Sequence, residues 1–199
     1  AMTKKAAALA NLELGALDPK IADAIMAACD QIIAGEGHEF FVVDMLQGGA
    51  GTSTNMNANE VIANMALRRI GKPRGDYASI NPNDHVNLSQ STNDVYPTAV
   101  RLTILRDCPS LLDSQIALKA AFLKKAAEFD HIIKVGRTQL MDAVPMRLGS
   151  EFRAFGVTVG EYVDRLKEFA NLLREVNLGV TAIGTGINTP GDYPATVVR

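Results

Sequence analysis

The sequence is poor in the residues and motifs that mark several classes of protein. It has two cysteines in 199 residues, Cys29 and Cys108, and neither lies in a Cys-x-x-Cys or Cys/His motif. Two cysteines this far apart fit a reducing compartment better than a disulfide scaffold, and they give no ligand spacing for zinc. The histidines, His38, His85 and His131, also lack the spacing of metal ligands. We therefore expect a cytoplasmic protein without a metal site.

Long runs of one kind of side chain are absent as well. The formal net charge is −2 and no basic run occurs, which argues against a nucleic-acid partner. No apolar run approaches the length of a membrane span and the N-terminus shows no signal-peptide pattern, so no membrane partner is expected. Hydrophobic residues make up 47% of the chain, which argues against disorder and allows a substantial core.

Helical periodicity dominates the rest of the chain. Asp18 and Pro19 are typical of an N-cap and a first helical residue, and this helix is expected to end near Gly35. Residues 40–43 are apolar and predict a strand or a buried extended piece. Three further helices are expected, at residues 57–70, 93–106 and 110–129. Gly71 is expected to stop the first of these three in a left-handed conformation.

The clearest pattern lies between residues 151 and 176, where apolar residues alternate in steps of three and four. They are Phe152, Phe155, Val159, Tyr162, Leu166, Phe169, Leu173 and Val176. This heptad seam, extended back to Pro145, predicts a helix of about 30 residues, which expects partner helices of similar length. The predicted fold is all-α: a long-helix bundle with a mainly helical N-terminal part that carries short extended pieces. Residues 1–90 are assigned to an N-terminal domain and residues 91–199 to the start of the bundle domain.

Three polar segments carry more hydroxyls and amides than helix capping requires. They are residues 48–57, 87–94 and 136–142, and each is expected just ahead of a helix. Neutral donors beside the free N–H groups of a helix N-terminus suit a carboxylate, so three such segments indicate a small substrate with several carboxylate oxygens. Structural alternatives stay open: capping by Ser, Thr or Asn, a flexible loop, and an ion pair between Arg137 and Asp142.

Five motifs, taken in order, resemble the aspartase/fumarase superfamily. They are Gly-Ala-Gly-Thr-Ser-Thr-Asn-Met-Asn at 49–57, Asn-Pro-Asn-Asp-His-Val-Asn at 81–87, Ser-Gln-Ser-Thr-Asn-Asp at 89–94, Gly-Arg-Thr-Gln-Leu at 136–140 and Ala-Ile-Gly-Thr-Gly-Ile-Asn-Thr-Pro at 182–190. Class II fumarases tend to have an aspartate at position 85, a serine at 92 and a histidine at 139. This chain has His85, Thr92 and Gln139 there, which favours the aspartate ammonia-lyases.

The resemblance implies a mainly helical homotetramer with a central bundle and with sites built from three subunits. It implies reversible deamination of L-aspartate to fumarate and ammonia without an organic cofactor. Proton removal beside a carboxylate creates a dianion, which preorganised donors stabilise. By the resemblance, the residues that contact substrate carboxylates are Thr52, Ser91, Thr92, Thr138 and Gln139. Asn93 would reach the amino group or the adjacent carboxylate, and the supporting residues are His85, Asn55 and Arg137.

One departure from the family is large. The family's catalytic base is a serine in a mobile Gly-Ser-Ser loop followed by Met-Pro-x-Lys-x-Asn-Pro, and nothing in this chain matches it. We therefore assign no catalytic residue here, interpret the chain as a central fragment, and expect the chain alone to be inactive. Two alternatives stay open: a class II fumarase acting on malate, or, for the isolated chain, a helical assembly module without chemistry. A scaffold would not need such dense hydroxyls and amides.

Overall fold

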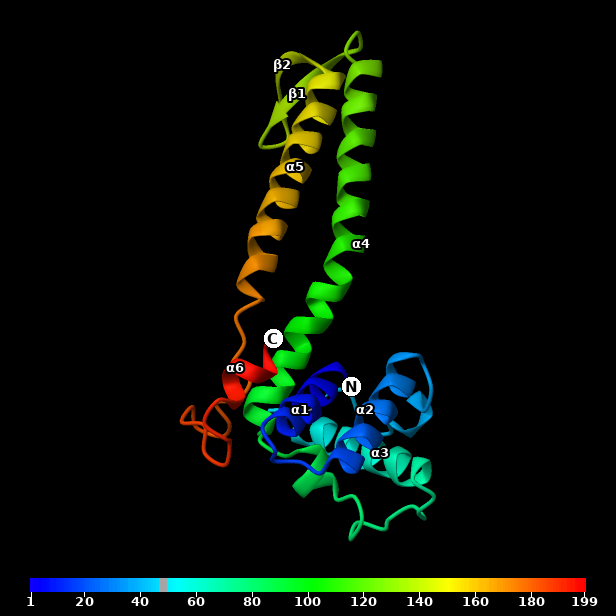
Figure 1. The fold of residues 1–199 in the computed structure, drawn as a ribbon. Coiled ribbons are helices and arrows are strands. Elements are labelled where there is room, and N and C mark those ends of the chain that lie inside the picture. The colour runs from blue at the N-terminus through cyan, green and yellow to red at the C-terminus, as the bar shows by residue number, and fades with distance from the viewer. Residues whose placement is uncertain (47–49) are drawn as a thin grey trace. The chain divides into compact units, whose positions relative to one another are not determined.

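The structure is a computed structural model that describes residues 1–46 and 50–199. Its elements, shown in Figure 1, are α1 (Met2–Glu13), α2 (Pro19–Ile33), the 3-10 helix η1 (His38–Phe40), α3 (Thr52–Arg69), the π-helical turn η2 (Pro82–Val86), α4 (Thr92–Glu128), β1 (Ile133–Thr138), β2 (Met141–Arg147), α5 (Leu148–Leu172) and α6 (Tyr193–Val197). The predicted mainly helical fold is confirmed. Gly48 and Gly49, from the first polar segment, lie outside the described residues. No helix in the described ranges is both long and apolar enough to cross a membrane.

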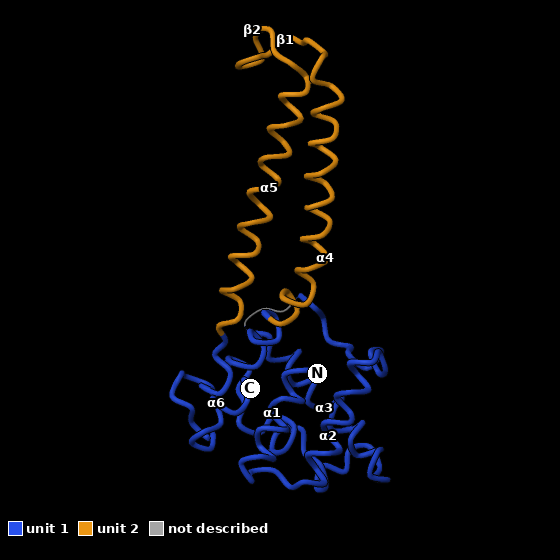
Figure 2. Tube along the Cα trace, turned by 45° about the horizontal axis from the view of Figure 1, so that its top comes forward, with its two compact units in different colours: residues 1–101, 176–199 blue, residues 102–175 orange. Residues whose placement is uncertain are grey.

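The chain divides into two compact units, coloured separately in Figure 2. Unit 1 consists of residues 1–101 and 176–199, and unit 2 consists of residues 102–175. Helix α4 therefore contributes its first residues to unit 1 and the others to unit 2. These units are defined by contacts within this chain, and the predicted domains 1–90 and 91–199 stay a prediction.

The core of unit 1 is built mainly from α2 and α3. Its fully buried members include Ala22, Ile25, Ala28 and Cys29 from α2 and Ile62, Ala63, Ala66 and Leu67 from α3. The predicted start of α2 is confirmed, because Asp18 Oδ1 accepts hydrogen bonds from the backbone N–H groups of Lys20 and Ile21 at 2.9 and 3.3 Å. The predicted stop after α3 is also confirmed, since Gly71 has a φ of +75°.

The predicted strand or buried piece at residues 40–43 is wrong. Helix η1 ends at Phe40, residues 41–43 form neither helix nor strand, and Val42 is 79% exposed. The Asn57 side chain donates to Phe40 O and accepts from the Val42 N–H, both at 3.1 Å. These bonds occupy backbone groups that a neighbouring strand would otherwise have used.

Two predicted helix boundaries are also wrong. Helix α3 begins at Thr52 rather than near residue 57, because Gly51 adopts a φ of +80° and forms its N-cap. Helix α4 is continuous over 37 residues, although two helices were predicted on either side of Pro109. Proline removes one helical N–H bond, but tertiary packing contributes most of the stability of a protein helix and here overrides that local preference.

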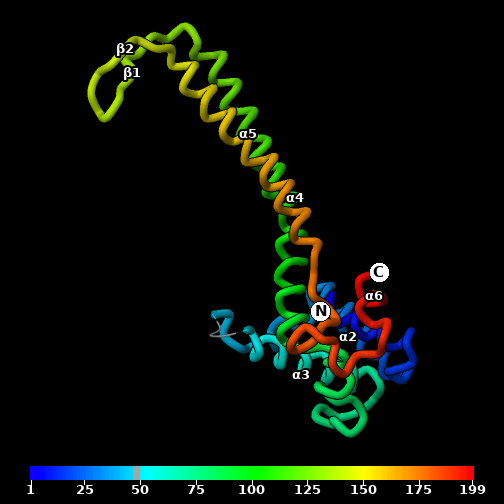
Figure 3. Tube along the Cα trace, turned by 90° about the vertical axis from the view of Figure 1, so that its left-hand side faces the viewer, coloured from blue at the N-terminus to red at the C-terminus, as the bar shows by residue number. Residues whose placement is uncertain are grey.

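In unit 2, α5 lies beside the later part of α4, as Figure 3 shows. The Phe122 ring of α4 packs against Phe152 and Phe155 of α5, with ring centroids 6.2 and 5.6 Å apart. Helix α5 has 25 residues and begins at Leu148, so the predicted start at Pro145 is wrong.

Strands β1 and β2 form an antiparallel hairpin that the sequence did not predict. Pro145 belongs to β2, and the third polar segment turns between two strands instead of preceding a helix. The turn residues Gln139 and Leu140 have φ values of +51° and +66°. Two-residue hairpin turns favour Asn and Gly at such positions, so the sequence carried no recognisable turn signal.

Candidate functional site

The start of α4 is capped by its own polar side chains. Asp94 Oδ1 accepts a hydrogen bond from the Ser91 N–H at 2.9 Å, and Ser91 Oγ accepts one from the Asn93 N–H at 3.2 Å. This reciprocal arrangement is a capping box, in which both side chains satisfy free N–H groups. Ser91 therefore caps the helix in this structure.

Asp94 also holds a distant loop against the same helix end. Its Oδ2 accepts from the N–H groups of Gly179 and Thr181 at 3.1 and 2.9 Å, and the side chain is fully buried. Asn93 Nδ2 donates to Ala182 O at 2.9 Å. The Asn93 amide is thus used in part to hold this loop, and Asp94 is a structural residue that the sequence did not single out.

Two polar residues of α1, about two turns apart, hold the segment before α4. Lys4 Nζ donates to Asn87 Oδ1 at 2.8 Å, and Asn11 Oδ1 accepts from Ser89 Oγ at 2.7 Å. Lys4 is 3% exposed, and burial lowers its pKa to about 7, an effect that the negative charge of Asp94 opposes. A lysine this buried is rare unless its charge is paired, so the hydrogen bond from Lys4 to Asn87 is an unusual feature of the protein interior.

Asn87 connects this lysine to two residues of the predicted site. Asn55 Nδ2 donates both to Asn87 Oδ1 at 3.2 Å and to Thr92 Oγ1 at 3.0 Å. Asn55 is 5% exposed, whereas Thr92 is half-buried. The structure therefore brings Asn55 and Thr92 together, and it adds Lys4 and Asn87, which the sequence did not predict as site residues.

Thr52 and His85 also lie in unit 1. Thr52 is the exposed first residue of α3. A Cβ added to Gly51 would lie 2.5 Å from the Tyr96 ring, so a glycine there lets the start of α3 approach α4 closely. His85 Nδ1 accepts from the Asn81 N–H at 2.9 Å and so closes its own turn.

The remaining predicted residues belong to unit 2. Thr138 and Gln139 are exposed at the turn of the hairpin. Arg137 Nε donates to Asp142 Oδ1 at 2.8 Å, which is the ion-pair alternative considered for this arginine. Both partners are largely exposed, so this pair adds little stability.

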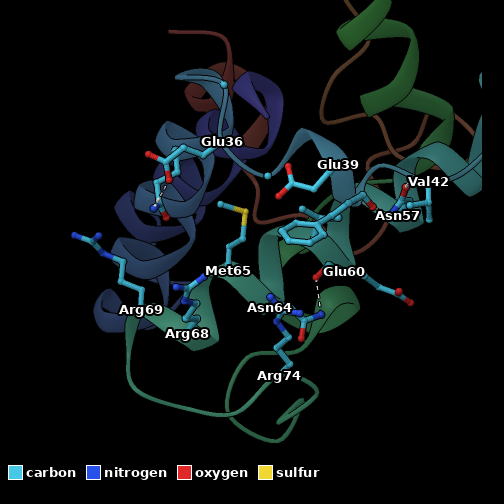
Figure 4. Close-up of a pocket in the computed structure, with 15 residues that line it drawn as sticks. Glu36, Glu39, Val42, Asn57, Glu60, Asn64, Met65, Arg68, Arg69 and Arg74 are labelled. Carbon is cyan, nitrogen blue, oxygen red and sulfur yellow. Dashed lines mark hydrogen bonds between the residues drawn. The ribbon is translucent and has the colours of Figure 1, made fainter.

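A cavity of about 1030 Å³ lies beside α3 in unit 1 (Figure 4). Its charged lining residues are Glu36, Glu39, Glu60, Arg68, Arg69 and Arg74. Asn57 and Asn64 brace its walls, since Asn57 binds Phe40 O and Asn64 Oδ1 accepts from the Gly75 N–H. A helix turns about 100° per residue, which puts Asn57 and Asn64 on the face of α3 opposite Asn55. The cavity is therefore separate from the hydrogen-bonded network of Lys4, Asn87, Asn55 and Thr92. Its lining carries both acidic and basic side chains, which indicates no preference for an anionic or a cationic ligand.

Within residues 1–46 and 50–199, no group of three His, Cys, Asp or Glu side chains could hold a metal ion. What the network offers is the half-buried Thr92 hydroxyl, which accepts a hydrogen bond from Asn55, with the buried Lys4 further behind it. A hydroxyl that already accepts from the protein can donate to an anionic oxygen.

Comparison with known proteins identifies the family. The profile of the family described as lyase matches residues 1–199, so the chain belongs to the lyase family. The chain is 59% identical to an aspartate ammonia-lyase of Pseudomonas fluorescens, 53% to one of Helicobacter pylori and 52% to one of Escherichia coli. Each match covers 100% of this chain and 42% of the relative, so the chain spans less than half of these curated relatives. The predicted superfamily resemblance is confirmed.

Solved structures agree with this assignment. Fumarate lyase:delta crystallin from Brucella melitensis, bound to cobalt, is 58% identical with a TM-score of 0.91 and matches 98% of this chain and 43% of that chain. A recombinant class II fumarase from Schistosoma mansoni is 37% identical with a TM-score of 0.87, and the match covers 98% of this chain and 41% of that one.

Proposed function

We propose that this chain is part of an aspartate ammonia-lyase, which converts L-aspartate reversibly to fumarate and ammonia. The observation that carries the proposal is the hydrogen-bonded set Asn87, Asn55 and Thr92, which presents a half-buried hydroxyl at the start of α4. The identity of 52–59% to aspartate ammonia-lyases supports the choice of substrate.

In this proposal, a base removes a proton from the carbon beside one carboxylate, the C–N bond breaks, and ammonia leaves. Negative charge builds on that carboxylate before the bond breaks, and neutral donors fixed in place stabilise it. We assign such contacts to Thr52, Ser91, Thr92, Thr138 and Gln139, and a contact with the amino group or the adjacent carboxylate to Asn93. No residue of this chain is assigned as the base, which we place elsewhere in the parent protein.

The proposal includes a homotetramer whose sites are shared between subunits. Phe155, Tyr162 and Phe169 recur at heptad spacing along α5, and their side chains are between 47% and 55% exposed. Exposed aromatic residues at this spacing are typical of a helix that packs into a bundle. We also place the parent protein in the cytoplasm, in amino-acid metabolism, which agrees with the unpaired state of Cys29 and Cys108.

Assay of the full-length parent protein with L-aspartate and with L-malate tests this function. We expect fumarate release from L-aspartate and little from L-malate. A class II fumarase is the second candidate, because the Schistosoma mansoni fumarase shares the fold at 37% identity. Fumarate formation from L-malate alone would replace our proposal with that candidate. Turnover by the isolated 199-residue chain would contradict the placement of the base outside it.

A further inference from the structure

We propose that Lys4 is a positioning residue which makes the Thr92 hydroxyl a hydrogen-bond donor toward the substrate. The inference rests on the proposed function and deepens it, because it assigns a direction to one contact of that site. Three hydrogen bonds connect Lys4 with Thr92: from Lys4 to Asn87, from Asn55 to Asn87, and from Asn55 to Thr92.

The Asn87 side-chain amide can take only one orientation, because the partners of its two ends require an oxygen on one side and an NH₂ group on the other. The Lys4 ammonium, 2.8 Å from Oδ1, has donors and no acceptor, so it requires an oxygen there. On the other side, Asn87 Nδ2 lies 3.3 Å from the carbonyl oxygen of Gln90, which can only accept. Lys4 and Gln90 together therefore fix the Asn87 oxygen toward α1 and Asn55.

The fixed oxygen of Asn87 then sets the orientation of the Asn55 amide. Only the NH₂ group of Asn55 can face Asn87 Oδ1, and its second proton points to Thr92 Oγ1 at 3.0 Å. Thr92 Oγ1 thus accepts a hydrogen bond from the protein. Since a hydroxyl has one proton, that proton is left to donate. Within residues 1–46 and 50–199, Thr92 Oγ1 donates no hydrogen bond to the protein, so the proton is available to a substrate carboxylate.

Without the Lys4 charge, only the 3.3 Å hydrogen bond to the Gln90 carbonyl oxygen still favours this orientation of the Asn87 amide. The Asn87 and Asn55 amides could both turn over, and the Thr92 hydroxyl would then donate inward to Asn55 Oδ1. The substrate carboxylate would meet a lone pair in place of a proton. The burial of Lys4 is consistent with such a role, because Asp94 supplies a compensating charge nearby.

A double-mutant cycle in the full-length parent tests the inference, with kcat/KM for L-aspartate as the readout, measured below pH 7, where Lys4 is charged. We expect Lys4→Met to lower kcat/KM by about tenfold to a hundredfold when Thr92 is present, on the scale of one misdirected donor. In a Thr92→Val background the same substitution should change kcat/KM by less than about threefold, since the hydroxyl it orients is gone. The matched control is Lys5→Met, at an exposed neighbour that pairs with Asp30, which should change kcat/KM by less than about twofold.

Equal effects of Lys4→Met in both backgrounds would overturn the inference, because they would show a structural role independent of Thr92. If Lys4→Met does not fold, the cycle is run with Asn55→Ala, which removes the residue that donates directly to Thr92 and should show the same coupling. Additive effects there would overturn it too. A parent without turnover of L-aspartate contradicts the proposed function, and the cycle is then read on the dicarboxylate that the parent does convert.

Discussion

The carboxylate of Asp94 accepts a hydrogen bond from the backbone N–H of Thr181, 87 residues further along the chain. The same buried carboxylate accepts from the N–H groups of Ser91 and Gly179. Hydrogen bonds from backbone N–H groups to a carboxylate are charge-assisted and are stronger than neutral ones. Asp94 therefore ties the loop at residues 177–182 to the first turn of α4, where Thr92 and Asn93 lie.

Asp94→Asn should destabilise the protein. The amide has an NH₂ group in place of one oxygen, so at least one of the three N–H donors would face another donor in a buried site. We expect a loss of about 2–4 kcal/mol, seen as a lower thermal midpoint. Asp164→Asn, at an exposed position on α5, is the control and should leave the midpoint nearly unchanged. Equal midpoints for the two variants would show that Asp94 does not hold the loop.

Thr92→Val should depress catalysis while the fold is retained. Valine keeps the shape of threonine but removes the hydroxyl, and loss of one donor to a developing charge costs about 10²–10³ in rate. Thr98→Val is matched in chemistry and lies on the same helix, but its hydroxyl donates inward to Asp94 O at 2.7 Å. We expect kcat/KM to fall sharply only for Thr92→Val. A loss of activity that simply follows thermal unfolding would assign Thr92 to capping.

The buried Lys4 should make stability depend on pH. In the folded protein its pKa is about 7, lowered by burial from 10.5, while the charge of Asp94 opposes the shift. Between these two values the unfolded chain binds more protons, so this group makes the folded state more stable as pH rises. The thermal midpoint of the parent should therefore rise relative to that of Lys4→Met between about pH 7 and pH 9. A difference that stays constant over this interval would contradict the assigned pKa.

Cys29 should resist thiol reagents in the folded protein. The residue is fully buried, and burial raises the pKa of its thiol to about 11, so almost no thiolate forms near neutral pH. Alkylation followed by mass spectrometry should show labelling of Cys29 only after denaturation. Rapid labelling of Cys29 under native conditions would mean that the packing between α2 and α3 opens readily.

The exposed aromatic stripe of α5 should be needed for assembly. Tyr162→Lys places a charge among Phe155 and Phe169, and we expect a smaller species on size-exclusion chromatography with light scattering. The control, Asp164→Lys, introduces the same residue about 200° further round the helix and should leave the assembly intact. An unchanged mass for Tyr162→Lys would remove this stripe from the subunit interface.

Local signals in the sequence predicted the elements that depend on local chemistry. The cap at Asp18 and the glycine stop at Gly71 are of this kind, because each acts on residues next to it. The elements that failed depend on distant partners. Residues 40–43 are shaped by the side chain of Asn57, and the hairpin turns at Gln139 and Leu140 without the residues that such turns prefer.

In the candidate site, too, local motifs were recognisable in the sequence and distant partners were not. The hydroxyl and amide motifs pointed to Asn55 and Thr92, and the structure joins them by a hydrogen bond. Lys4 escaped notice because it lies in an alanine-rich helix and meets Asn87 across 83 residues. A lysine and an asparagine about two turns apart on one face of a largely apolar helix were the available signal, at Lys4 and Asn11.

The most direct measurement is a crystal structure of the full-length parent with succinate, a dicarboxylate that has no amino group to lose. We expect one carboxylate oxygen at about 2.5–3.0 Å from Thr92 Oγ1, with Asn55 still donating to that hydroxyl from behind. Succinate bound elsewhere, with Thr92 in contact with protein alone, would contradict the assignment of this hydroxyl and its supporting chain to the substrate.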